Sequence, residues 1–214
     1  MTALALFDLD NTLLDRDQAF ALWTQQFLDV HGLGEDAQST IEQADGDGYS
    51  PREEFFAELR SKLGIGGTID ELLADYYVVY PSKFTVKPDV ISAVRSLRDV
   101  GFKVGVVTNG PPSQWAKFEA AGIEDEFDAV CISSVVGANK PELAIFEEAA
   151  RLCGLPLNGW MVGDSPEADV AGGLAAGLRT IWINRGRKWS NLDFSPEFTV
   201  ASVPEAVAII LRPD

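Results

Sequence analysis

The chain has 214 residues, of which 46% are hydrophobic and 23% are charged. That length suits one large domain or two small ones, and the hydrophobic share is sufficient for a buried core. The chain contains 17 Lys and Arg residues and 33 Asp and Glu residues, so its net charge is −16. This charge argues against a nucleic acid or an anionic membrane as a partner, since both bind basic surfaces.

The rarer residue types narrow the possible chemistry further. Cys131 and Cys153 lie in unrelated patterns that indicate neither a disulfide framework nor a zinc site. No basic segment precedes Asp8 and no apolar run reaches the ~20 residues of a membrane helix, so we expect a reduced cytoplasmic protein without a signal peptide. The one histidine, His31, ends a helical pattern just before a Gly-Leu-Gly sequence. We therefore expect carboxylates, rather than a Ser-His-Asp triad, to carry the chemistry.

The first seven residues predict a buried strand that ends on two acids, Asp8 and Asp10. Residues i and i+2 of a strand point to the same face, so this spacing places two carboxylates side by side. Like charges repel, and each is costly to remove from water. Such a pair indicates a bound cation or a charge-separating reaction.

Residues 15–83 show helical periodicity and no strand alternation. Apolar residues recur at spacings of three and four from Phe20 to Val30. Ser50 before Pro51, with Glu53 three residues after the serine, predicts an N-cap and capping box for a second helix. A third helical segment spans residues 68–80. We interpret the whole block as a helical insertion after the first strand.

From residue 84 onward, helices and strands alternate. The pattern predicts helices over residues 88–100, 112–122, 140–154, 166–177 and 203–211, and strands over residues 102–110, 127–134, 159–165 and 179–186. This alternation predicts an α/β fold with a Rossmann-like parallel sheet covered by helices on both faces. We expect a discontinuous α/β core of residues 1–14 and 84–214, and an all-helical inserted domain of residues 15–83.

Polar residues stand where three of these strands end. These residues are Asp8 and Asp10, Thr108 and Asn109, and Asp164, with Asp169 five residues further on. Lys140 stands just before Pro141, at the start of a predicted helix. Ligands of parallel sheets bind at the carboxyl ends of the strands, so these groups should converge. Three carboxylates at one edge form a hard, oxygen-rich site, which suits Mg²⁺ better than zinc.

The stretches DLDNTLLD, VVTNG, NKP and GDSPEAD resemble, in order, the four motifs of the haloacid dehalogenase (HAD) superfamily. Residues 15–83 resemble the helical cap that this superfamily inserts after its first motif. The resemblance extends over the whole chain. It implies a Rossmann-like core domain with a helical cap domain.

The resemblance also implies the roles of the acids. Asp8 would attack phosphorus and form an aspartyl-phosphate, and Asp10 would act first as a general acid and then as a general base. Asp8, the main-chain carbonyl of Asp10, and Asp164 would hold Mg²⁺, which shields the nucleophile from an anionic substrate.

Further residues would support that chemistry. Thr108 and Asn109 would bind the phosphoryl oxygens, and Lys140 would supply positive charge to Asp8 and the phosphate. Asp169 would orient the lysine or a metal-bound water, and Thr12 would fix the loop that presents Asp10.

The function implied is Mg²⁺-dependent hydrolysis of a small phosphorylated metabolite by a monomer or homodimer. A dehalogenase would need neither Asp10 nor Asp164, whereas a phosphomutase would keep every core residue. Two alternatives are not enzymes of this superfamily. One is a phosphorylation-responsive receiver domain, but its motifs occur in a different order along the chain. The other is a catalytically silent binding protein, which would not require Asp10.

Simpler interpretations exist for each motif taken alone. Asp164 to Pro166 would also serve as a helix N-cap, and Thr108 to Gly110 would also serve as a turn. The basic stretch NRGRKW, residues 184–189, favours a plain surface loop over a contact for a substrate or a partner subunit.

Overall fold

The computed structural model describes residues 3–190 and 193–212. The chain divides into two compact units. Unit 1 combines Met1–Asp15 with Thr85–Asp214, and unit 2 consists of Arg16–Phe84.

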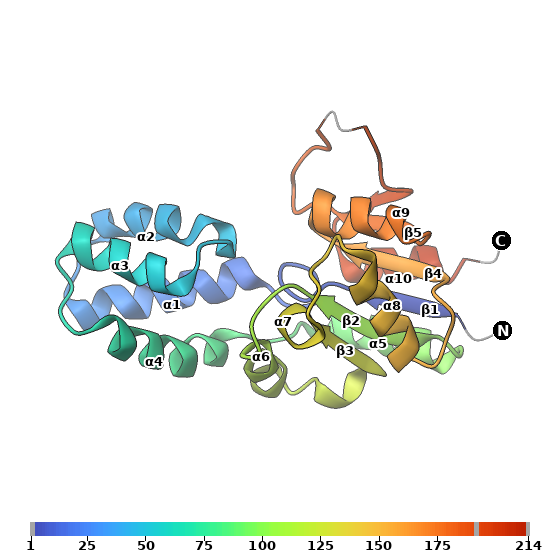
Figure 1. Cartoon of the computed structure of the whole chain (residues 1–214), viewed down its shortest axis with the longest axis horizontal. Helices are drawn as coiled ribbons and strands as arrows, with labels where there is room; N and C mark the ends of the chain where they lie inside the picture. The colour runs from blue at the N-terminus through green and yellow to red at the C-terminus, as the bar shows by residue number, and fades with distance from the viewer. Residues whose placement is uncertain (1–2, 191–192, 213–214) are drawn as a thin grey trace. The chain divides into compact units, whose positions relative to one another are not determined.

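Unit 1 contains a six-stranded sheet in which every neighbouring pair is parallel. Its strand order is β3-β2-β1-β4-β5-β6, so β1 lies between β2 and β4 (Figure 1). The strands are β1 (Leu4–Phe7), β2 (Lys103–Thr108), β3 (Ala129–Ile132), β4 (Gly159–Gly163), β5 (Arg179–Ile183) and β6 (Phe198–Val200). The predicted α/β fold class is confirmed. Strand β6 is an addition, because three residues are too short to show a period.

Helices cover the sheet. They are α5 (Pro88–Asp99), α6 (Gln114–Ala121), α7 (Ser133–Val136), α8 (Leu143–Leu152), α9 (Gly172–Ala175) and α10 (Val203–Ile210), with a 3-10 turn at Glu124–Glu126 and a π-helical turn at Pro166–Ala171. Helix α8 packs its Ile145 and Phe146 into a core with Leu4 and Leu6 of β1. Helices α5 and α10 contact each other and the strands β2 and β4 respectively. All four residues of β1 are buried, as a strand covered on both faces requires.

The order of strands places a topological switch point at β1. From β1 the chain adds β2 and β3 on one side, and then crosses back to add β4, β5 and β6 on the other. Ligands of such sheets bind where the order reverses, outside the carboxyl ends of the strands. The residues after Phe7 therefore begin at the place where this fold forms a site.

Unit 2 consists of helices joined by short turns. Its helices are α1 (Arg16–His31), α2 (Gln38–Asp45), α3 (Arg52–Leu63) and α4 (Ile69–Val79), with 3-10 turns at Glu35–Ala37, Gly46–Gly48 and Pro81–Lys83. Aromatic side chains form its core: the ring of Trp23 lies 4.8 Å from that of Phe27 and 5.2 Å from that of Tyr76, measured between centroids. Aromatic pairs of this kind stabilise beyond their buried area. His31 is the last residue of α1, as the pattern predicted.

The predicted cap of α3 is wrong. Pro51, rather than Ser50, occupies the N-cap position and makes no side-chain cap bond. The carbonyl of Ser50 accepts hydrogen bonds from the guanidinium of Arg52 instead. A capping box does occur at α4, where Thr68 and Glu71 bond each other's main chain.

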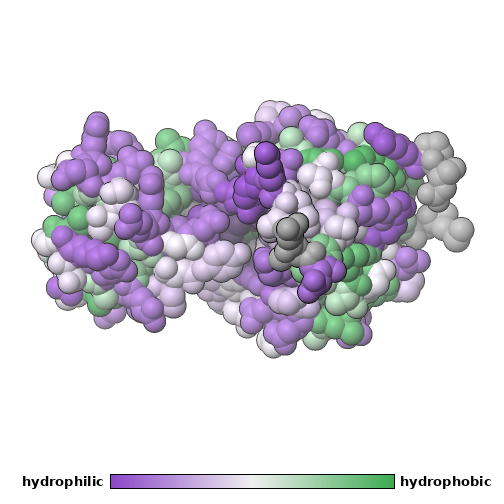
Figure 2. All heavy atoms as spheres, turned by 90° about the horizontal axis from the view of Figure 1, so that it is seen from above, coloured by the Kyte–Doolittle hydropathy of each residue, from purple (hydrophilic) through white to green (hydrophobic). Residues whose placement is uncertain are grey.

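Hydrophilic residues predominate on the face shown in Figure 2, with smaller hydrophobic patches between them. Across residues 3–190 and 193–212, the structure contains no helix with both the length and the apolar character needed to cross a membrane.

Candidate active site

The main chain turns sharply after β1. The N–H of Asp8 still donates to the carbonyl of Val162 over 2.9 Å, which continues the pairing with β4. Beyond it, the N–H groups of Leu13 and Leu14 both donate to the carbonyl of Leu9. Asn11 has a φ of 59°, in the left-handed region that Asn tolerates better than most residues. The loop therefore doubles back instead of extending the strand.

The two acids that follow β1 contact different lysines. The carboxylate of Asp8 contacts the ammonium of Lys140, whereas that of Asp10 contacts the ammonium of Lys117. Because β1 ends at Phe7, the two acids do not lie on one continuous strand. The charge of Asp10 still raises the pKa of Asp8, so the two carboxylates interact, although each contacts a different lysine.

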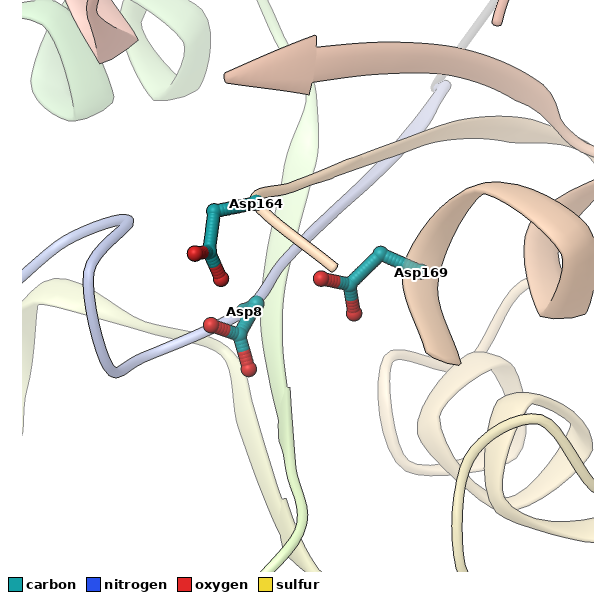
Figure 3. A group of neighbouring side chains, drawn as sticks. All are labelled: Asp8, Asp164 and Asp169. Carbon is teal, nitrogen blue, oxygen red and sulfur yellow. The ribbon is translucent and has the colours of Figure 1, made fainter. Parts of the chain in front are cut away.

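Three carboxylates do converge at the carboxyl ends of the strands (Figure 3). Asp8 follows β1, Asp164 follows β4, and Asp169 lies in the π-helical turn after β4. One oxygen of each lies within 4.8 Å of those of the other two. Figure 3 shows the three side chains directed toward a shared space. Closely spaced hard oxygen donors of this type suit Mg²⁺, so the residues present are compatible with such an ion.

Lys140 connects two of these acids. Its Nζ lies 2.6 Å from Oδ1 of Asp8 and 2.7 Å from Oδ1 of Asp169, and the residue is only 4% exposed. Burial alone would lower the pKa of Lys140, but the charges of Asp169 and Asp8 raise it above its usual value. The two acids therefore favour the charged form of this lysine.

Burial acts in the opposite direction on the acids. It raises the pKa of Asp8 to about 7, against the lowering influence of Lys140 and with a further rise from Asp169. Burial likewise raises the pKa of Asp169, although Lys140 and the N–H of Ser165 lower it. The ionised form of Asp8 thus depends on the positive charge beside it.

Asn109 positions the lysine through its main chain. Its amide nitrogen donates to the carbonyl of Lys140 over 2.9 Å, and its amide oxygen accepts from the N–H of Lys140 over 2.8 Å. Both ends of the Asn109 side chain are thus engaged. Its expected contact with phosphoryl oxygens stays a prediction, and the structure gives it this additional role.

Thr108 is the last residue of β2 and is 1% exposed. Its Oγ1 accepts a hydrogen bond of 2.9 Å from the side-chain amide of Gln114, the first residue of α6. Because a threonine hydroxyl both accepts and donates, its own hydrogen is available for a further acceptor.

The basic stretch after β5 is not a plain surface loop. Arg185 and Arg187 donate to Oδ2 of Asp164 over 2.8 Å and 3.0 Å. The indole N–H of Trp182 donates to the main-chain carbonyl of Asp164 over 2.8 Å. Burial and the charge of Asp8 raise the pKa of Asp164 to about 6, and the two guanidinium groups oppose that rise.

Thr12 lies in the turn after Asp10, where its N–H donates to the carbonyl of Leu9. Its hydroxyl oxygen is buried and has no hydrogen-bond partner among the residues that the structure describes. Main-chain bonds therefore hold this loop, and a stabilising role for the Thr12 side chain stays a prediction.

The sequence patterns missed four residues of this site: Gln114, Lys117, Arg185 and Arg187. The signal for the first two was a Gln and a Lys three residues apart on the helix that follows a polar strand end, a spacing that places them on one face. The signal for the arginines was the basic cluster itself, directly after a strand of the same sheet. Neither signal identifies the carboxylate that each cation contacts.

Comparisons with known proteins agree with this geometry. The model of the haloacid dehalogenase-like hydrolase family matches residues 2–177. The chain belongs to this family, and the resemblance drawn from its four motifs is confirmed.

Among its relatives is a glyceraldehyde 3-phosphate phosphatase of Methanopyrus kandleri, 30% identical over 98% of this chain and 97% of that enzyme. The pyrimidine 5'-nucleotidase YjjG of Escherichia coli is 34% identical to this chain, and the matched region covers 60% of this chain and 58% of that enzyme. A crystal structure of a HAD phosphatase from Thermococcus onnurineus has a TM-score of 0.70 and 31% identity, covering 99% of this chain and 98% of that one. The prediction of a phosphatase-type enzyme of this family is confirmed.

Proposed function

We propose that the protein is a Mg²⁺-dependent phosphatase that hydrolyses a small phosphate monoester through an aspartyl-phosphate on Asp8. The observation that supports this most directly is the buried contact of 2.6 Å between Asp8 and Lys140 at the switch point of the sheet. The charge of Lys140 favours the ionised form of this carboxylate at the place where a parallel sheet binds its ligand. The named relatives, which act on small phosphorylated molecules, support the same class of substrate.

In the first half-reaction, a carboxylate oxygen of Asp8 attacks phosphorus, and the bond from phosphorus to the ester oxygen breaks. Asp10 gives its proton to the departing oxygen, which leaves as an alcohol. Lys140 stabilises the anionic nucleophile, and Thr108 donates its hydroxyl hydrogen to a phosphoryl oxygen. Asn109 and Asp169 hold Lys140 in place.

In the second half-reaction, Asp10 accepts a proton from water, and the resulting hydroxide oxygen attacks phosphorus. The bond to Asp8 breaks, inorganic phosphate leaves, and the carboxylate of Asp8 is restored. Splitting one difficult displacement into two easier ones is the advantage of a covalent intermediate.

A bound Mg²⁺, held by the carboxylates of Asp8 and Asp164 and the main-chain carbonyl of Asp10, would supply positive charge that offsets repulsion between the nucleophile and an anionic substrate. Three acids this close together, with Asp8 and Asp169 buried and Asp164 half-buried, are consistent with such an ion. Asp10 and Asp164 both argue against a dehalogenase, which requires neither. A phosphomutase would keep the same core, and no described contact favours it. The cytoplasmic location, the monomer or homodimer state and the domain boundaries stay predictions.

The test is hydrolysis of p-nitrophenyl phosphate by the purified chain with MgCl₂, with excess EDTA, and by the Asp8→Asn variant. We expect turnover that EDTA abolishes and restored Mg²⁺ recovers. Asp8→Asn should lose at least about 10³-fold in kcat, because an amide is a poor nucleophile, while its circular dichroism spectrum stays that of the wild type. A panel of phosphorylated three- to six-carbon metabolites and nucleotides follows. Turnover that survives in Asp8→Asn would contradict the assigned nucleophile.

A further inference from the structure

Among the described contacts of the acids assigned to the mechanism, those of Asp10 are made with side chains of α6. The Nζ of Lys117 lies 2.7 Å from its Oδ1 and 2.6 Å from its Oδ2. The amide nitrogen of Gln114 lies 2.9 Å from the same Oδ2. Two side chains from one helix therefore fix both oxygens of the carboxylate.

Both of these side chains lie largely out of water. Gln114 is 4% exposed and Lys117 is 8% exposed, although Lys and Gln usually lie at the surface. Burying an ammonium is costly unless a charged partner compensates it. Lys117 therefore occupies this position together with an anion, and the structure places the carboxylate of Asp10 there.

Gln114 extends the connection to the strand end. Its amide nitrogen also donates to Oγ1 of Thr108 over 2.9 Å, so its two N–H groups join Thr108 to Asp10. The residue assigned to bind a phosphoryl oxygen and the residue assigned to move the proton are thus held by one amide. Because Thr108 ends β2 and Gln114 begins α6, their relative position is fixed by the fold of unit 1.

We propose that Lys117 and Gln114 are positioning residues for Asp10, and that they hold its carboxylate where it accepts a proton from water in the second half-reaction. This inference rests on the proposed function. A general base must lie within hydrogen-bond reach of the proton that it takes, so a small displacement costs much of its effect. A carboxylate with both oxygens fixed also cannot rotate away while water approaches.

The test uses Lys117→Met, which keeps an unbranched chain of similar length and removes the ammonium. In p-nitrophenyl phosphate hydrolysis with saturating Mg²⁺, we expect kcat to fall by about 10- to 100-fold, with KM within about threefold of wild type, as the loss of a well-placed base predicts. The second half-reaction should become rate-limiting. A rapid burst of one p-nitrophenol per enzyme should then precede the slow steady state, which a general loss of folded enzyme would not produce.

Two further variants separate positioning from damage. Gln114→Met should show a smaller loss of the same kind, since Lys117 still holds both oxygens. Lys103→Met is the matched control, because Lys103 also pairs with an aspartate, Asp128, over 2.7 Å, but at the opposite end of β2. It should leave kcat within twofold of wild type. In an Asp10→Asn background, the added effect of Lys117→Met should largely disappear, as expected for residues that act as a unit.

A crystal structure of Lys117→Met provides a readout that does not depend on turnover. We expect the Asp10 carboxylate to leave its position or to occupy more than one. Retention of kcat within twofold, or an Asp10 carboxylate that stays in place, would overturn the inference while the phosphatase assignment stands. A wild type that turns over neither p-nitrophenyl phosphate nor any member of the phosphate panel would instead refute the proposed function, and this inference with it.

Discussion

At the scale of single residues, Lys140 is the buried cation that pairs with two acids of the candidate site. It lies between Asp8 and Asp169, and its side chain is 2% exposed. Lys140→Met would leave two buried carboxylates without compensation. Breaking a buried ion pair on one side costs about 3–5 kcal/mol of unfolding free energy, whereas an exposed pair costs under about 1 kcal/mol.

Urea unfolding of metal-free Lys140→Met, with Lys103→Met beside it, checks this difference. The Lys103 side chain is 45% exposed, so its variant should unfold close to wild type. Adding Asp169→Asn to Lys140→Met should recover part of the lost stability, since it removes one of the two uncompensated charges. Equal stability of the two lysine variants would contradict the role given to Lys140.

Lys140 and Lys117 also show how far the sequence can predict a site. Lys140 was predictable because it precedes Pro141 in a motif that resembles a known family. Lys117 carries no such motif, and its contact with Asp10 joins residues 107 positions apart. The roles of long-range ion pairs depend on how elements dock, and a pattern of local spacings does not contain that information.

At the scale of elements, the end of β4 is packed against the turn that follows it. A Cβ added at Gly163 would lie 2.1 Å from Oδ2 and 2.2 Å from Cγ of Asp169. The Asp169 side chain has little freedom to move, because Lys140 and the N–H of Ser165 hold its two oxygens. We therefore expect Gly163→Ala to lose about 1–3 kcal/mol of unfolding free energy through overpacking.

The same substitution should also reduce kcat, because it moves the acid that holds Lys140. Gly66→Ala is the control, since a Cβ there meets no atom within 4 Å. Thermal unfolding and p-nitrophenyl phosphate turnover of both variants measure the two effects. If Gly163→Ala matched Gly66→Ala in both thermal stability and turnover, the residues around Gly163 would be able to move aside and accommodate the added Cβ.

The elements themselves were largely predictable from hydrophobic period. Each of the four strands predicted after residue 84 corresponds to a strand of the sheet, because runs such as Val104 to Val107 are buried on both faces. Local chemistry was less informative at the element ends. At α3 the N-cap is Pro51 rather than Ser50, and the carbonyl of Ser50 accepts from Arg52. The hydrophobic period also did not predict the turn after Phe7, where Asn11 has a left-handed φ.

At the scale of the whole molecule, a net charge of −16 makes any cation stabilising to some degree. Added salt screens the mutual repulsion of exposed acids without binding at a particular place. An ion bound at Asp8 and Asp164 would act differently, because it binds the folded state alone and stabilises it by RT ln(1 + [L]/Kd). The two contributions can be separated by comparing MgCl₂ with NaCl at equal ionic strength.

We expect MgCl₂ at about 100 times its Kd to add about 2.7 kcal/mol, which for a chain of this size raises the Tm by about 5–10 °C more than matched NaCl does. Asp164→Asn should lose most of that specific rise and keep the general effect of salt, because its amide is a weaker Mg²⁺ ligand and its remaining acids are unchanged. Differential scanning calorimetry of both proteins gives the comparison without any substrate. If NaCl reproduced the full shift, or if Asp164→Asn kept it, the converging acids would be a source of repulsion that general screening relieves, and Asp164 would not be a ligand of the ion.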